Sequence, residues 1–386
     1  MTSRSTRPAT RSPSPTSPSG PVFLLAGCTA RRAALSERAR RALAETDHEA
    51  LAYELARRRL LPLVGTRALE AAGDVCPPSF HAHVRAAVTA ARARGIAVEA
   101  ELRRTVALLA DHGIRALPLK GPLLAAEAHG DYGLRETDDV DLLVPPARLH
   151  EAADLLAAAS YARMDDPIRP NGLPDLHLAL QHPQGPRIEL HWRVHWYEEA
   201  FSEDMLARAE PGPDGLLRPR PDDLAAALLL FYARDGLYGV RLAADIAGWW
   251  DRHGDALPPG FLEGHARCYP ALAPALTAAA EAAERLTGVP ATGWLGSAAV
   301  RGRRVEIATR LSNWTQSGDR DQLAANISLA DGLLGPRGSV GAFARRQLQP
   351  RAGALVPHAT KTVARYAIAL WRVRGGRWWS PLPDAR

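Results

Sequence analysis

Two aspartates near the middle of the chain have the types and spacing to do chemistry. Asp139 and Asp141 alternate with apolar residues in the sequence Asp-Val-Asp-Leu-Leu-Val. Because side chains two positions apart in a β-strand share a face, this alternation predicts a strand that carries both carboxylates on one side. Two carboxylates held so close repel each other, and a divalent cation between them removes the repulsion. The segment therefore predicts a metal site.

A second candidate strand, residues 187–196, alternates in the same way. Its apolar positions are Ile188, Leu190, Trp192 and Val194, and its polar positions are Glu189, His191, Arg193 and His195. Taken alone, such a polar face is typical of a solvated sheet surface. Beside the aspartate pair, Glu189 becomes a candidate third carboxylate on the same sheet. Since carboxylates suffice for Mg²⁺, we expect His191 and His195 to be structural or to face a substrate rather than to bind the metal.

The turn Lys120-Gly121-Pro122 joins a short apolar strand predicted over 114–119 to a helix predicted over 123–129. Pro122 suits the first position of a helix. A helix that starts after a glycine turn offers free backbone N–H groups and its positive dipole end to a phosphate. Lys120 adds a point charge, and it is one of only two lysines in the chain. Strand–glycine–helix turns are common, so this turn alone does not identify a phosphate site.

These elements must be positioned by a largely helical chain. Residues 80–111 are rich in Ala and Arg and predict a long helix that bends near Gly95 and ends at Gly113 as its C-cap. Residues 176–181 and 187–196 read as two strands joined by a tight loop, which predicts a hairpin.

Further helices are predicted before and after the hairpin. Residues 149–159 are amphipathic, and residues 222–233 and 240–250 are strongly apolar. Asp245 lies inside the last of these segments. An acid within an apolar helix is either a surface position or a paired core group, and the sequence leaves both open.

The composition indicates a globular protein and gives little information about partners. The chain has 386 residues, of which 46% are hydrophobic and 23% charged, with a formal charge of +6. Only Lys120 and Lys361 are lysines, so the other 46 of the 48 basic residues are arginines. A genome-wide codon bias explains most of this positive charge, although an anionic partner would also fit it.

The cysteines and the apolar runs favour a cytoplasmic protein. Cys28, Cys76 and Cys268 lie far apart, with neither metal-ligand spacing nor an even disulfide count. No apolar run approaches the ~20 residues that span a bilayer. Residues 25–28 resemble a lipoprotein cleavage box, but the apolar stretch before Cys28 is shorter than a signal core needs. We therefore interpret this segment as the start of the folded domain.

Composition and pattern divide the chain into five regions. Residues 1–20 predict a disordered tail, 21–113 an N-terminal helical region, 114–215 the core with the strands, 216–335 a helical C-terminal domain and 336–386 a basic segment. We interpret the basic segment first as a helix docked by its aromatic residues. Contact with an anionic membrane surface or another polyanion is the alternative.

One ordered set of motifs resembles a known family. The set comprises Leu-Lys120-Gly121, Arg135-x-x-x-Asp139-Val-Asp141-Leu-Leu-Val and Ile-Glu189-Leu-His191-Trp. Together with the amphipathic helix between the strands, it resembles the bacterial uncharacterised nucleotidyltransferase family, which belongs to the DNA polymerase β-like superfamily. The similarity extends over about residues 28–250. An Asp-x-Asp sequence alone is common, but the ordered set is much more specific.

The resemblance implies an α+β fold: a small mixed β-sheet of nucleotidyltransferase type, with a helical lead-in and a helical C-terminal part. It implies transfer of a nucleoside monophosphate from an NTP to a hydroxyl-type acceptor, with one or two Mg²⁺ ions. Asp139, Asp141 and Glu189 would be the catalytic metal ligands. The acceptor, whether a small molecule, sugar, peptide or protein side chain, is not identified by the sequence. Nucleic acid is not expected as a partner, since no aromatic–basic signature supports it.

The resemblance also implies a nucleotide site. Lys120 and Gly121 would lie at the triphosphate, and Arg135 would be either a phosphate or substrate clamp or a salt-bridge partner of Asp138. Related proteins usually have Gly-Ser or Gly-Gly at the turn, whereas Pro122 supplies neither a hydroxyl nor an N–H; Lys120 could compensate. This departure supports an alternative function, a catalytically degenerate nucleotide-binding or partner-binding protein of the same fold.

Overall fold

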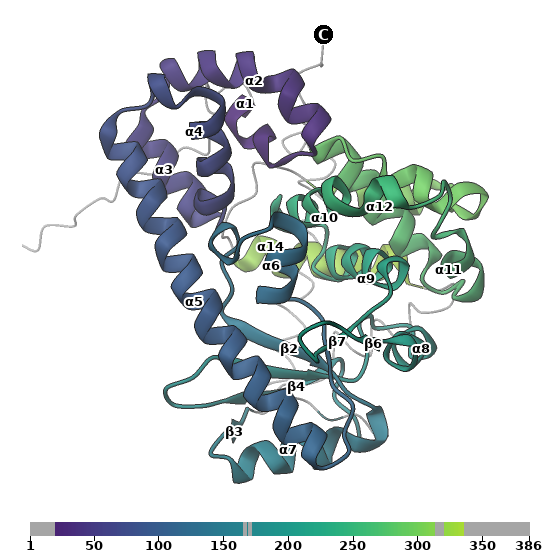
Figure 1. Cartoon of the computed structure of the whole chain (residues 1–386). Helices are drawn as coiled ribbons and strands as arrows, with labels where there is room; N and C mark the ends of the chain where they lie inside the picture. The colour runs from purple at the N-terminus through teal and green to yellow at the C-terminus, as the bar shows by residue number, and fades with distance from the viewer. Residues whose placement is uncertain (1–19, 165–167, 169–171, 313–319, 336–386) are drawn as a thin grey trace, which may run out of the picture.

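The structure is a computed structural model, and it describes residues 20–164, 168, 172–312 and 320–335 (Figure 1). The predictions for the N-terminal tail and for the basic segment 336–386 lie outside the described residues. Among the helices of the described residues, none is long and apolar enough to cross a membrane.

A small mixed sheet lies within a mostly helical protein, which confirms the predicted α+β class. Its strands are β1 (Leu117–Pro118), β2 (Asp139–Leu143), β3 (Ala162–Arg163), β4 (His177–Gln181) and β5 (Arg187–His191). Their order across the sheet is β1-β2-β5-β4-β3. Strands β2 and β5 pair in parallel, and the other neighbours are antiparallel.

The predicted hairpin is confirmed as the antiparallel pair β4–β5, but the second strand is shorter than expected. It ends at His191 rather than at Trp196. Beyond this point the Arg193 side chain donates hydrogen bonds to the carbonyls of Asp175 and Trp196, which hold the chain in a turn. The strand predicted over 114–119 is likewise shorter than expected, because β1 consists of two residues, Leu117 and Pro118.

The two faces of the sheet have different neighbours. The apolar face, with Val140, Leu142, Ile188 and Leu190, packs against α5 (Pro78–Asp111) and α7 (Leu149–Ala158) in one buried cluster. Figure 1 shows α5 running across the sheet and continuing beyond it to the N-terminal helices. The opposite face carries the carboxylates and meets the C-terminal helices.

Helix α5 runs unbroken from Pro78 to Asp111, so Gly95 does not interrupt it, and the predicted bend there stays a prediction. Gly95 instead allows close packing: a Cβ there would lie 3.1 Å from the Cβ of Tyr132. The predicted end of the helix is confirmed, because His112 is the C-cap and Gly113 follows with a φ of +66°.

The remaining elements are mostly helices. Their bounds are α1 (Gly20–Phe23), α2 (Thr29–Ala44), α3 (His48–Arg57), α4 (Thr66–Ala72), α6 (Pro122–His129), α8 (Ala200–Arg208), α9 (Pro221–Arg234), α10 (Arg241–His253), α11 (Glu263–Cys268), α12 (Ala273–Thr287), α13 (Arg303–Thr309) and α14 (Arg320–Leu334). A two-stranded sheet joins β6 (Glu210–Pro211) to β7 (Leu217–Arg218).

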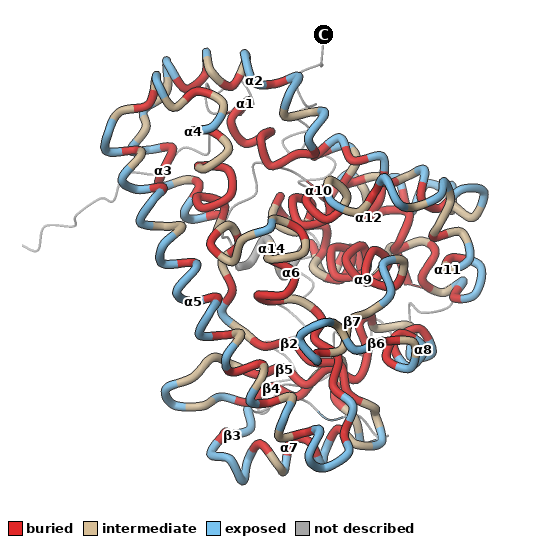
Figure 2. The backbone as a smooth tube through the Cα atoms, in the orientation of Figure 1, coloured by how far each residue is buried: buried red, intermediate tan, exposed pale blue. Residues whose placement is uncertain are grey.

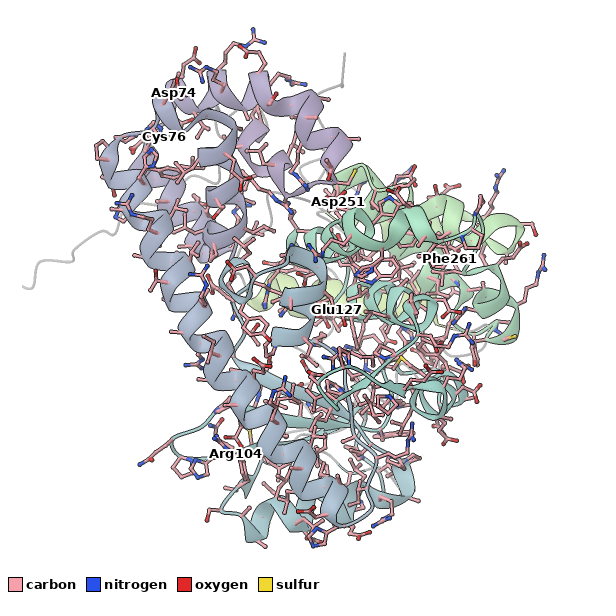
Figure 3. All side chains as sticks on the ribbon, in the orientation of Figure 1. Asp74, Cys76, Arg104, Glu127, Asp251 and Phe261 are labelled. Atoms are coloured by element: carbon pink, nitrogen blue, oxygen red, sulfur yellow. The ribbon has the colours of Figure 1, made fainter. Side chains whose placement is uncertain are left out.

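The helices before and after the sheet share one hydrophobic core. Residues of α1 pack in the same buried cluster as α9, α10 and α12, and Cys28 is part of it. The segment interpreted as the start of the folded domain is thus buried in this core. Figure 2 shows α9 buried along nearly its whole length, from Asp223 to Arg234. Asp251 ties the parts together at their junction (Figure 3): it accepts from the Thr29 N–H at 2.8 Å and pairs with Arg32 at 2.9 Å.

Candidate active site

The pairing of β2 with β5 assembles the carboxylates. In the parallel register, Asp141 lies opposite Glu189 and Asp139 lies opposite Arg187. The three acids come from two adjacent strands and share one face because each strand alternates. This face is not solvated, in contrast to the expectation from residues 187–196 alone: Glu189, His191, Arg193 and His195 are all buried.

Asp141 is buried between two nitrogen donors. The Lys120 Nζ lies 3.4 Å from its Oδ2, and the His191 Nε2 lies 3.0 Å from its Oδ1. Burial alone would raise the pKa of Asp141, but Lys120 and His191 together hold that pKa well below its usual range. Asp141 is therefore ionised at neutral pH.

Glu189 is held by three basic side chains. Its carboxylate lies 2.7 Å from Arg187 Nη2, 3.4 Å from His191 Nε2 and 3.8 Å from His177 Nδ1. Burial opposes the charge, yet the hydrogen bond from His191 lowers the pKa of Glu189. Burial and the neighbouring His191 lower the pKa of His177 to about 3, so its ring is neutral at pH 7.

Asp139 differs from the other two carboxylates. It lies half-buried at the start of β2, and its nearest cationic atom is Arg187 Nη2, 3.8 Å from Oδ2. Burial and the negative charge of Asp141 raise the pKa of Asp139. A carboxylate that resists ionisation beside a second carboxylate gains most from a bound cation.

The turn at Lys120 brings its ammonium to the carboxylates. Leu119 donates its N–H to the Asp141 carbonyl at 3.1 Å, which fixes the turn beside β2. Gly121 has a φ of +74° and a ψ of −143°, a conformation that glycine adopts readily, and Pro122 starts α6 as predicted. The Lys120 Nζ also lies 4.8 Å from the centre of the Phe231 ring on α9.

Arg135 pairs with Asp245 and not with Asp138, the partner that the sequence suggested. Its Nε lies 3.0 Å from Asp245 Oδ2, and the predicted pairing with Asp138 is wrong because Asp138 pairs with Arg59 instead. Asp245 also accepts from His129 Nε2 at 3.0 Å, so it is the paired core group of the two alternatives. A role of Arg135 at the nucleotide stays a prediction.

Two residues beside the carboxylates were missed at the level of the sequence: His177 and Arg187. The hairpin register places His177 opposite His191, so counting back from the tight loop would have found it. Ligand atoms of His177, Glu189 and His191 lie within 4.8 Å of one another. The ring of His195, by contrast, lies tilted against the rings of Trp196 and Tyr197.

The donor set fits a hard divalent cation. Asp139, Asp141 and Glu189 supply carboxylate oxygens from adjacent strands, and oxygen ligands are those that Mg²⁺ prefers. The three acids as metal ligands stay a prediction, because the groups of described residues whose ligand atoms lie within 4.8 Å of one another are His177–Glu189–His191 and Asp222–Asp223–His265, and neither contains Asp139 or Asp141.

A small mixed sheet carrying a carboxylate triad, flanked by helices, is the arrangement of a nucleotidyltransferase. The chain belongs to the family described as uncharacterised nucleotidyltransferases, whose model matches residues 44–287. The match includes both triad strands, the Lys120 turn and helices α9 and α10. Among curated proteins, the comparison found no match.

Proposed function

We propose that the protein transfers a nucleoside monophosphate from an NTP to a hydroxyl-type acceptor, with Asp139, Asp141 and Glu189 as Mg²⁺ ligands. The observation that carries this proposal is the parallel register of β2 and β5, which sets Asp141 beside Glu189. Membership of the family supports the reaction class.

Each residue has a distinct task in this proposal. When bound, Mg²⁺ would neutralise charge on the attacking and leaving oxygens. Lys120 and His191 keep Asp141 ionised and hold its carboxylate in place. The lowered pKa of Glu189 makes it a better metal ligand than proton acceptor. The acceptor oxygen would form the new bond to the α-phosphorus while its proton passes to bulk water, and pyrophosphate would leave as the bond to the β-phosphate oxygen breaks.

A second function has a specific observation in its favour. Pro122 provides no N–H at the start of α6, and Lys120 already lies against Asp141. A protein that binds nucleotide or a partner without turnover would tolerate both features. This alternative predicts binding of an NTP with no transfer to any acceptor.

A labelling experiment separates the two functions. The protein is incubated with Mg²⁺, each of the four NTPs labelled at the α-phosphate, and an extract of metabolites and proteins. Transfer predicts label in a new product with wild type and none with Asp141→Asn. Asp74→Asn alters an exposed carboxylate that, among the described residues, pairs with Arg40 alone, and it serves as the matched control. Label transfer that survives Asp141→Asn would refute the site assignment.

A further inference from the structure

Helix α9 ends in an arginine whose hydrogen-bonding capacity is only partly used. Arg234 is 8% exposed, and its Nε donates to the neighbouring Asp235 at 3.3 Å. Its Nη1 is buried and has no hydrogen-bond acceptor within the part of the chain that the structure describes. A guanidinium carries five N–H donors, and a buried donor without an acceptor costs free energy. A buried group of this kind suits a ligand that brings its own acceptors.

Arg234 and Lys120 share one aromatic ring. The Arg234 Cζ lies 5.0 Å from the centre of the Phe231 ring, and the Lys120 Nζ lies 4.8 Å from the same centre. Lys120 is in turn 3.4 Å from Asp141. The ring therefore connects a cation of the C-terminal helices to the carboxylate site. Figure 1 shows α9 between α12 and the strands.

Arg234 lies near the candidate site through Phe231, because the ring that it contacts also contacts Lys120, which lies 3.4 Å from Asp141. The candidate site therefore has acidic side chains on the strands and two basic side chains at one aromatic ring. A metal-bound polyphosphate is the ligand class whose charges match both parts, since its oxygens bind the metal and also accept from fixed cations.

We propose that Lys120 and Arg234 form a phosphate-binding pair that receives the polyphosphate of the nucleoside triphosphate. This inference rests on the proposed function for the identity of the ligand. The pair supplies the donors that the Gly121-Pro122 turn lacks, because Pro122 has no N–H and no hydroxyl. The guanidinium fork matches phosphate oxygens, and the lysine adds a point charge. Arg234 would thus link the helical C-terminal part to the nucleotide.

Calorimetric titration tests the pair with two probes: inorganic tripolyphosphate without metal, and the NTP that wild type binds most tightly with Mg²⁺. Arg234→Gln should weaken binding of both probes by roughly tenfold or more, because one charge-assisted contact is lost. Arg234→Lys keeps the charge but loses the planar guanidinium. Its affinity for both probes should fall between that of wild type and that of Arg234→Gln. Arg58→Gln is the matched control, since Arg58 is equally buried and lies over the Phe23 ring, 4.5 Å from its centre.

The outcomes separate this inference from the proposed function. Thermal melts identify any variant that fails to fold, and Arg234→Lys then carries the test. Wild-type affinity for tripolyphosphate in the Arg234 variants, or no tripolyphosphate binding by wild type, overturns the pair. If tripolyphosphate binding depends on Arg234 while no NTP binds in a Mg²⁺-dependent way, the pair stands and the proposed function fails. Equal losses in Arg58→Gln would assign the effect to general destabilisation and overturn the pair.

Discussion

At the scale of single residues, the candidate site places three acidic side chains close together beside a few basic side chains. Asp141 and Glu189 have lowered pKa values, so their ionised forms stabilise the fold above the pKa of the unfolded chain. That contribution is lost as the pH falls through their folded-state pKa values. Asp139 has the opposite sign: its raised pKa means that its ionised form opposes folding at neutral pH. The three carboxylates are therefore not equivalent, and Asp139 is the one that a cation would relieve.

Asp139→Asn should stabilise the metal-free protein at pH 7, because it removes a charge that burial and Asp141 disfavour. A rise in melting temperature of roughly 1–2 °C is expected. The gain should vanish as the pH falls through the raised pKa of Asp139 to that of an aspartate in the unfolded chain, because the wild-type side chain then becomes protonated. Mg²⁺ should raise the melting temperature of wild type and leave the variant unchanged. Equal stabilisation of both proteins by Mg²⁺ would remove Asp139 from the metal site.

At the scale of elements, buried ion pairs tie the segments around the sheet to the helices. Asp245 on α10 binds Arg135, which precedes β2, and His129, which ends α6. Burial would raise the pKa of Asp245, but Arg135 and His129 hold it well below its usual range. These ion pairs hold the end of α6 and the residues before β2 against α10. They thereby position the chain between the Lys120 turn and the aspartates.

Asp245→Ala should be strongly destabilising, because it leaves two buried basic groups without their acid. The expected loss in the free energy of unfolding is about 3–5 kcal/mol. Asp74→Ala, which breaks an exposed pair with Arg40, should lower the free energy of unfolding far less, because solvent screens that pair. Urea unfolding followed by circular dichroism measures both. Similar losses in the two variants would contradict the structural role of Asp245.

How much could be predicted from the sequence also differs between elements. Alternation in two short segments was enough to place Asp139, Asp141 and Glu189 on one face of a sheet, because period-two patterns fix which side chains share a face. The signal at Gly95 was ambiguous, since a glycine that permits close packing looks the same in the sequence as one that bends or breaks a helix. Arg234 could not be found, because Lys120 reaches the Phe231 ring only through the packing of α9, and no local pattern records tertiary packing.

At the scale of the whole molecule, the site lies where the sheet meets the C-terminal helices. Lys120 comes from the turn before α6, the carboxylates from β2 and β5, and Phe231 and Arg234 from α9. The N-terminal helices share a core with α9, α10 and α12. Parts that are distant in the sequence are thus needed to hold one site. The predicted division into separate regions stays a prediction, and the shared core argues for testing the whole chain.

The central claim is that the carboxylate triad binds a nucleotide through Mg²⁺. The most direct measurement is calorimetric titration of wild type, Asp141→Asn and the Asp74→Asn control with each of the four NTPs, with and without Mg²⁺. The account predicts Mg²⁺-dependent binding of at least one NTP to wild type and to the control. It predicts loss of that binding, by about a hundredfold or more, in Asp141→Asn. Binding of no NTP by wild type, or undiminished binding by Asp141→Asn, would contradict the account.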